Sequence, residues 1–370
     1  MVEQKRLSFR TVVPFLAAGI FVFLIYIYFL VPFGDLVQTL QQVNPFYFLM
    51  ALGMVFVAAA FYALTWQKLL EMLDVKASLL KAFQFVWAAN FVDILVPAES
   101  LAGDFTRIYL MSKETEGNAG KVVASVLSHR ILGTIVTVTS LLISTVYFVI
   151  DYNPPLLVLE LVILIAALNA FYIGLMFYLS ARKATTERIV NWFVRVVVRF
   201  SRGHWKQEHL KESAMATMNT FYDGIAALSV NRKGFVKPLF LSCLSWIFDV
   251  LISVMVFFSL GHLGAAISVS AIIIVYSVSI VIHYIPLVSG ELGITEIVMT
   301  TMFILLGNPQ DIAVFAAATV LIRVLTLWVR LFVGGIIVQI MGIKSLVSSQ
   351  GGIAQIDTSR AATVKTEKQE

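Results

Sequence analysis

The sequence is poor in charged residues and almost lacks cysteine. Only 13% of its 370 residues are charged and 59% are apolar, whereas about 25% of a soluble domain is charged. Mean hydropathy is +0.89, and a soluble domain of this length could not bury so much apolar surface. The composition therefore excludes an ordinary soluble enzyme and a disordered chain. The single cysteine, Cys243, excludes an intramolecular disulfide and a cysteine-ligated metal site.

The common motifs of catalysis are also missing. The chain has no phosphate-binding glycine loop, no HExxH and no GxSxG motif, and its five histidines are scattered. We therefore expect no enzymatic activity, no catalytic residues, no metal and no cofactor. The net charge of +5 raises the question of nucleic-acid binding, which the placement of the basic residues answers in the negative below.

Long apolar runs predict an all-α, multi-pass membrane protein with about six full spans. Three further apolar stretches, 82–96, 266–285 and 297–306, are short or bounded by proline or glycine. They predict two broken or re-entrant helical units, which membranes tolerate where backbone is buried in protein or lines a cavity. Whether 82–97 and 266–308 turn back or cross is left open. The predicted full spans are 13–33, 45–66, 131–150, 156–179, 239–260 and 312–341.

Lys and Arg residues orient these spans. All but three of the 27 fall on one predicted side, and the loops 34–44, 151–155 and 261–265 on the other side have none. Both termini of a plasma-membrane protein are therefore expected in the cytoplasm, and no nucleic-acid partner is expected.

The same pass along the chain predicts its domain organisation. A transmembrane domain is expected over 1–343 and a disordered cytoplasmic tail over 344–370. A basic amphipathic cytoplasmic segment is expected over 181–237. Within it, 186–203 is interpreted as a helix on anionic headgroups or, alternatively, as a solvated connector.

Two distant stretches resemble each other. ASVLSHRIL at 124–132 and ATVLIRVL at 318–325 share an arginine in a similar apolar setting. The predicted orientation sends these two helices in opposite directions, so the units would be inverted repeats, which are typical of transporters. Chance similarity over so few residues is the alternative. Upstream of Arg130 lie Pro97, Glu99, Gly103 and Asp104, and upstream of Arg323 lie Pro286, Gly290, Glu291, Gly293 and Glu296.

Ionisable residues within the membrane are costly unless paired or hydrated, so each is a functional candidate, with a permanent ion pair as the alternative. Arg323 and Asp249 are predicted near mid-depth, and an arginine there binds phosphate or a carboxylate such as Glu296 or Asp249. Arg130, at the predicted end of its helix, and Arg330 could instead snorkel to the interface. The candidate lipid- or substrate-binding residues are Asp104, Arg107, Arg130, Asp249, Glu291, Glu296 and Arg323, and the candidate helix breaks are Pro97, Gly103, Pro286, Gly290 and Gly293.

Four motifs carry a family resemblance: VPAESLAGDFTRIYL at 96–110, SVLSHRIL at 125–132, YIPLVSGELGITE at 284–296 and VLIRVLTLW at 320–328. As a set, over about residues 10–342, they resemble the lysylphosphatidylglycerol synthase transmembrane, or flippase-like, family, which is related to the membrane domain of the multiple peptide resistance factor. The chain departs from the family pattern at His129 and Gly133, where acidic neighbours of the arginine are usual, and at Ser289, where glycine is common.

The resemblance implies translocation of a phospholipid or lipid-linked headgroup through a cavity between inverted units. It implies membrane lipids, with anionic headgroups in particular, as partners. The multiple peptide resistance factor makes its aminoacylated lipid with a separate soluble domain, which we do not expect here. Two other interpretations stay open. The chain would be a non-transporting accessory of a lipid synthase or glycosyltransferase partner, or a secondary transporter of a small solute. Lipid identity, direction, energy coupling and oligomeric state are left open.

Overall fold

A computed structural model describes residues 33–96, 101–115, 118–152, 156–200, 207–282 and 293–342. These ranges hold 12 α-helices, and the only strand-like pairing within them is an isolated bridge between Leu263 and Ile267. The predicted all-helical class is therefore confirmed. The predicted first span, 13–33, lies outside the described residues except for Phe33, and the predicted tail at 344–370 lies wholly outside them.

Five helices in the described part of the chain are long and apolar enough to cross a membrane. They match the predicted second to sixth spans, so the multi-pass architecture is confirmed. They are α3 (Pro45–Glu71), α6 (Ala119–Tyr152), α7 (Leu156–Ala181), α10 (Val236–Ser259, continuous with a 3₁₀ turn at Arg232–Phe235) and the helix over 312–342 that begins with α13 (Ile312–Arg323).

One predicted helix boundary is wrong, and one predicted loop contains a short helix. The span expected to begin at Ile131 begins at Ala119, because α6 continues toward its N-terminus where it packs on α9 (Gln207–Val230). Gly120 permits this contact, since its N–H donates to Thr220 Oγ1 over 3.1 Å and a side chain there would collide with α9. The expected outer loop 34–44 contains a short helix, α2 (Phe33–Gln41).

Local sequence sets the start of the helices that frame the core. Asn44 caps α3 by accepting a hydrogen bond from the N–H of Phe46 over 3.0 Å, and Pro45 occupies the first turn, where its missing N–H costs nothing. Ser78 caps the next helix, α4 (Leu79–Leu95), by accepting from the N–H of Lys81. Sharp starts of this kind fix where each helix enters the bundle.

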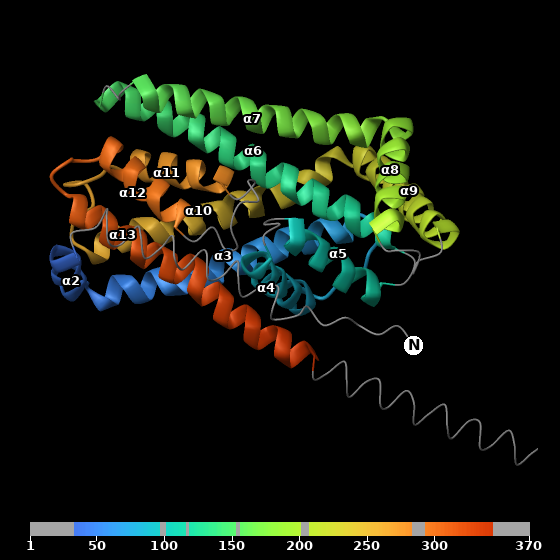
Figure 1. Ribbon diagram of the computed structural model, residues 1–370, viewed down its shortest axis with the longest axis horizontal. Helices are drawn as coiled ribbons and strands as arrows, with labels where there is room; N and C mark the ends of the chain where they lie inside the picture. The colour runs from blue at the N-terminus through green and yellow to red at the C-terminus, as the bar shows by residue number, and fades with distance from the viewer. Residues whose placement is uncertain are drawn as a thin grey trace, which may run out of the picture.

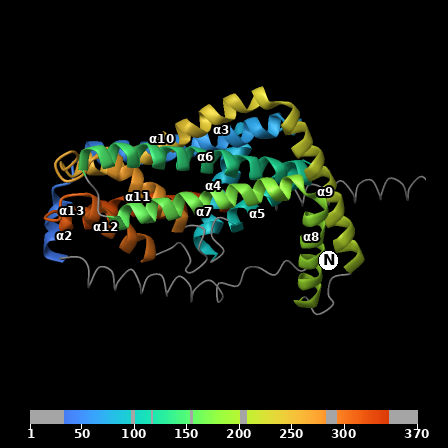
Figure 2. The same cartoon turned by 90° about the horizontal axis from the view of Figure 1, so that it is seen from above.

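Four short helices form two units with the long helices that follow them. We call α4, α5 (Leu101–Glu114) and α6 the first unit, and α11 (Val269–Ile282), α12 (Ile294–Leu306) and α13 the second unit. Each short helix has 17 residues or fewer, less than the about 20 needed to cross a bilayer. In Figures 1 and 2, α4 and α5 lie toward one end of the long axis and α11 and α12 toward the other. The two pairs of short helices are thus separated along the long axis of the bundle.

Two helices lie across one end of the bundle. In both views α8 (Lys183–Phe200) and α9 run transverse to the long apolar helices, while α2 lies at the opposite end (Figures 1 and 2). The predicted segment 181–237 therefore contains two helices joined through 201–206, which lie outside the described residues. A transverse basic helix has the geometry of a segment at a membrane surface.

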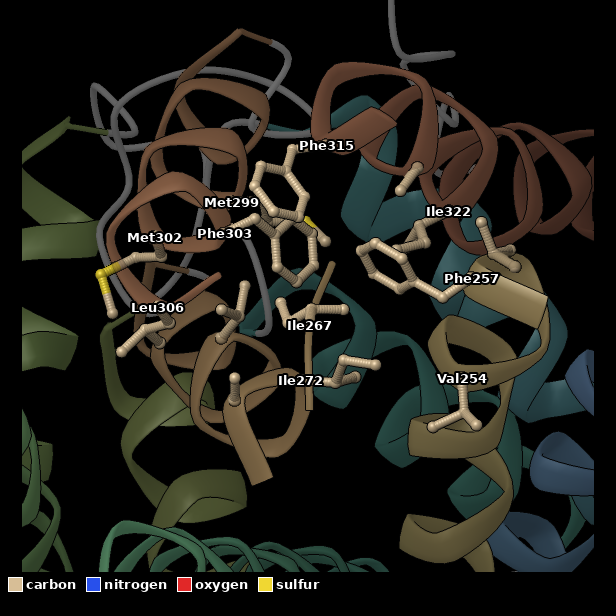
Figure 3. Close-up of a cluster of buried hydrophobic side chains, with 14 of the residues drawn as sticks. Val254, Phe257, Ile267, Ile272, Met299, Met302, Phe303, Leu306, Phe315 and Ile322 are labelled. Carbon is tan, nitrogen blue, oxygen red and sulfur yellow. The ribbon is translucent and has the colours of Figure 1, made fainter. Parts of the chain in front are cut away.

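Buried apolar side chains form two main clusters. The larger one centres on α10 to α13, where the ring of Phe303 packs edge-on against Phe257 and stacks with Phe315, with centroid separations of 5.1 and 6.2 Å (Figure 3). The other joins α3, α4, α5, α6 and α9 around Trp66 and Phe85. Between the helices of both units the lining turns polar, and there the candidate site lies.

Candidate functional site

A cavity of about 300 Å³ opens between the two units. It takes its walls from α3, α4, α5, α6, α10, α11, α12 and α13, so helices far apart in sequence enclose it. Ser253, Tyr276, Ser279 and Thr326 supply hydroxyl groups, beside apolar residues such as Met299. Its charged lining residues in the described ranges are Asp93, Asp104, Asp249, Arg107, Arg130, Arg323 and Arg330.

Arg107 is held rigidly in the wall of the first unit. Its side chain is 3% exposed, and its guanidinium carbon lies 5.3 Å from the ring centre of Tyr62 and 5.2 Å from that of Trp66. Its Nη1 lies 3.2 Å from Nδ1 of His129, and its Nη2 donates to Asp104 Oδ1. Cation–π contacts on two aromatic faces and these polar partners leave little freedom. Arg107 is thus a fixed charge that shapes the site.

Asp104 binds two arginines at once. Its Oδ1 accepts from Arg107, and its Oδ2 lies 2.5 Å from Nη2 of Arg130. The side chain of Arg130 is 14% exposed, several times more than that of Arg107, and it faces the cavity. Arg130 lies well inside α6, so its predicted place at a helix end is wrong. Asp104 is thus shared by two guanidiniums, and Arg130 is the more accessible of them.

Asp93 on α4 closes the same corner of the cavity. Its Oδ1 accepts a hydrogen bond from the N–H of Gly103 over 2.6 Å. A side chain at position 103 would collide with the carboxylate of Asp93, so this glycine is needed for the close approach of α5 to α4. Asp93 forms no ion pair with any residue in the described ranges. A carboxylate that faces a cavity without a cation is unusual inside a membrane protein.

In the second unit Arg323 is matched to its own carboxylate. Its Nε donates to Glu296 Oε1 over 2.8 Å, and both side chains are buried. The other carboxylate oxygen of Glu296 accepts from the N–H of Gly293 over 2.7 Å, closing a capping interaction at the start of α12. Gly293 has φ of 88°, in the left-handed region that glycine tolerates best. Backbone and side chain therefore fix Glu296 against Arg323.

A second pair follows along the last helix. Arg330 Nη2 donates to Asp249 Oδ1 of α10 over 2.7 Å, and these side chains are 30% and 20% exposed. Snorkelling of Arg330 and a pairing of Asp249 with Arg323 were among the predicted possibilities; the structure instead pairs Asp249 with Arg330. Between the two arginines the helix widens into a π-turn, η3 (Val324–Trp328). Such turns are rare in proteins, and those that occur often lie at functional sites.

The two units repeat one arrangement. In each, a carboxylate near the start of the second short helix pairs with an arginine on the following long helix, Asp104 with Arg130 and Glu296 with Arg323. In each, a glycine N–H also donates to a carboxylate, Gly103 to Asp93 and Gly293 to Glu296. This agreement extends the resemblance seen between the two sequence stretches.

The structure brings together most of the predicted site. Asp104, Arg107, Arg130, Asp249 and Arg323 line one cavity, and Glu296 lies directly behind Arg323. Gly103 lies in the first turn of α5, and Gly293 is the N-cap of α12. The predicted residues Glu291, Pro97, Pro286 and Gly290 lie outside the described residues.

Sequence reasoning missed the aromatic support of Arg107. Tyr62 and Trp66 lie one helical turn apart on α3, and this spacing was the available signal. It also did not single out the hydroxyl lining from α10, α11 and the π-turn. In the described ranges no three His, Cys, Asp or Glu side chains gather as a metal site requires.

Comparison with known proteins decides the family. The profile described as lysylphosphatidylglycerol synthase TM region matches residues 16–334. The chain belongs to that family. Among its relatives, the UPF0104 membrane protein of Pyrococcus horikoshii is 24% identical over 322 residues, covering 85% of this chain and 92% of the relative. A UPF0104 membrane protein of Methanothermobacter thermautotrophicus is 27% identical over 317 residues, covering 83% and 87%. The predicted family resemblance is therefore confirmed, and the cavity described above lies within the region that this family shares.

Proposed function

We propose that this protein moves phospholipid headgroups between the two leaflets of its membrane. The observation that supports this most is the charged cavity between the two units, inside a bundle of apolar helices. Ionisable groups at such depth are costly, and they persist where they pair with one another or with a passing ligand. The cavity thus offers a polar path for a headgroup while the acyl chains stay in lipid.

Ion-pair exchange would let the headgroup phosphate bind and leave. Without lipid, Asp104 compensates Arg130, and on entry the phosphate takes hydrogen bonds from the guanidinium in place of the carboxylate. Arg130 is the best candidate for this exchange because it is more exposed than Arg107 or Arg323 and shares its carboxylate. Arg323, with Glu296 fixed behind it, would hold the phosphate nearer the other end.

We further propose that the end of the bundle with α8 and α9 lies at the cytoplasmic surface. The exposed residues Arg182, Lys183 and Arg188 lie at the start of this transverse layer, and Lys and Arg are enriched on cytoplasmic sides. Anionic lipids of that leaflet would be electrostatic partners of the layer. The second candidate function, an accessory of a lipid synthase or glycosyltransferase, has no comparable structural support.

A leaflet-exchange assay tests the proposal. The purified protein is placed in vesicles that contain phospholipid with a fluorescent acyl chain, and a membrane-impermeant reductant bleaches only the outer leaflet. We expect the inner-leaflet label to become accessible in protein-containing vesicles and to stay protected in empty ones. Arg130→Gln is expected to slow the exchange about tenfold. This factor corresponds to the loss of one charge-assisted contact of about 1.4 kcal/mol.

Arg182→Gln is the matched control, because Arg182 is exposed and lies outside the cavity. It is expected to exchange lipid like the wild-type protein. If folded wild-type protein does not accelerate lipid exchange, the proposed function is overturned. Equal rates for Arg130→Gln and wild type would overturn the assignment of the cavity.

A further inference from the structure

The charged residues of the cavity indicate which headgroup it binds best. Its described lining holds four arginines and three aspartates, and Glu296 behind Arg323 brings the number of carboxylates to four. Against these described charges, a headgroup with only a phosphate would leave a net negative charge in a region of low dielectric. Adding a headgroup with one phosphate and one cation would preserve the balance, which is energetically favoured where charges are desolvated.

The position of Asp93 says where that cation would lie. Three of the four carboxylates bind arginine, whereas Asp93 accepts only the N–H of Gly103 among the described residues. Gly103 directly precedes Asp104, the partner of Arg130. Asp93, which has no ion pair among the described residues, and Arg130, the proposed phosphate ligand, are thus held at one corner of the cavity by two consecutive residues of α5.

We infer that Asp93 is a specificity-determining residue, which accepts the ammonium group of a zwitterionic aminophospholipid whose phosphate binds Arg130. This inference rests on the proposed function and names its substrate class. A primary ammonium donates N–H hydrogen bonds to the carboxylate and also neutralises it. A trimethylammonium group has the charge but no N–H donor, and a glycerol headgroup has donors but no charge. The site therefore ranks the ethanolamine headgroup above the other two.

The same exchange assay tests this with three lipids that carry an identical labelled acyl chain: phosphatidylethanolamine, phosphatidylcholine and phosphatidylglycerol. We expect phosphatidylethanolamine to exchange severalfold faster than either of the others. Asp93→Asn keeps an oxygen that can accept from the N–H of Gly103, so the contact between α4 and α5 is retained while the charge is lost. In this variant the ratio of ethanolamine to choline lipid rates is expected to fall toward one.

Asp151→Asn is the matched control, since Asp151 is an exposed carboxylate at the far end of α6, and its ratio should equal that of the wild type. Thermal unfolding of each variant in detergent shows that it is folded. The inference is overturned if phosphatidylglycerol exchanges fastest, or if folded Asp93→Asn keeps the wild-type ratio. In both cases the proposed function would stand, because lipid would still move; only a wild-type protein that moves none of the three lipids would contradict that function.

Discussion

The first and second units place the same chemical pair, a carboxylate and an arginine, in different surroundings. In the second unit Glu296 is 1% exposed and is fixed by the N–H of Gly293 as well as by Arg323. In the first unit Asp104 is 15% exposed and divides its two oxygens between Arg107 and Arg130. One pair is closed and matched, whereas the other is open and shared.

The same pair of residues can therefore have a different role in each unit. The closed pair secures the packing of α12 against α13, because two buried charged side chains compensate each other there. The open pair places the more exposed arginine in the same cavity as Asp93, a carboxylate that forms no ion pair among the described residues. We therefore expect stability to depend mainly on the second unit and the proposed ligand exchange mainly on the first.

The largest expected effect follows from breaking the closed pair. Arg323→Gln leaves Glu296 buried without its cation, and removing one partner of a buried ion pair costs about 3–5 kcal/mol. We expect the free energy of unfolding in detergent to fall by this amount, measured by chemical or thermal unfolding. A loss below about 1 kcal/mol, the size typical of exposed pairs, would show that the second unit is not closed.

Removing the shared carboxylate is expected to have the next largest effect. Asp104→Asn leaves Arg107 and Arg130 without the carboxylate that they share. We expect a cost of about 3 kcal/mol, the lower end for a buried pair, because this site is more exposed. Lipid exchange should also change, since Arg130 loses its resting partner. Unchanged exchange by a variant that is folded but less stable would separate Asp104 from transport.

Two glycines of the first unit differ in the space around them. Gly103→Ala puts a methyl group against the carboxylate of Asp93 and is expected to lower stability by about 1–3 kcal/mol, as overpacking does. Gly133→Ala meets no atom within 4 Å and replaces a glycine inside α6, so it should raise stability by up to about 1 kcal/mol. Shifts in unfolding midpoint of the same sign in both variants would contradict the close contact of α4 and α5.

The smallest effect is expected at the second pair of the last helix. Arg330 and Asp249 are 30% and 20% exposed, so solvent screens their attraction. Arg330→Gln is expected to cost about 1 kcal/mol, the upper end for an exposed pair, in the same unfolding experiment. A loss as large as that of Arg323→Gln would mean that the pair of Arg330 and Asp249 is as closed as the pair of Arg323 and Glu296.

Much of the fold could be predicted from the sequence because apolar runs are local properties. The runs at 45–66, 156–179, 239–260 and 312–341 each became a long helix, since a chain in lipid must satisfy its backbone hydrogen bonds internally. The start of α6 could not be predicted in this way. Lys121 and Arg130 suggested a boundary, but packing of Gly120 on α9 keeps the chain helical through both.

The members of the site could also be predicted, because charge is rare in this chain and stands out within apolar segments. Their pairing could not. Asp249 and Glu296 were equivalent partners for Arg323 on sequence grounds, and only the packing of α10 against the last helix assigns Asp249 to Arg330. Likewise, the rigid placement of Arg107 depends on α3, which is distant in sequence.

The most direct test of the central claim is to fill the cavity and measure lipid exchange. Ser253 of α10 lines the cavity, so Ser253→Trp places an indole in the proposed path. Ile247, on the same helix, is 42% exposed, and Ile247→Trp is the matched control. We predict that folded Ser253→Trp exchanges lipid no faster than empty vesicles, while Ile247→Trp behaves like the wild type. Wild-type exchange by folded Ser253→Trp would contradict the account.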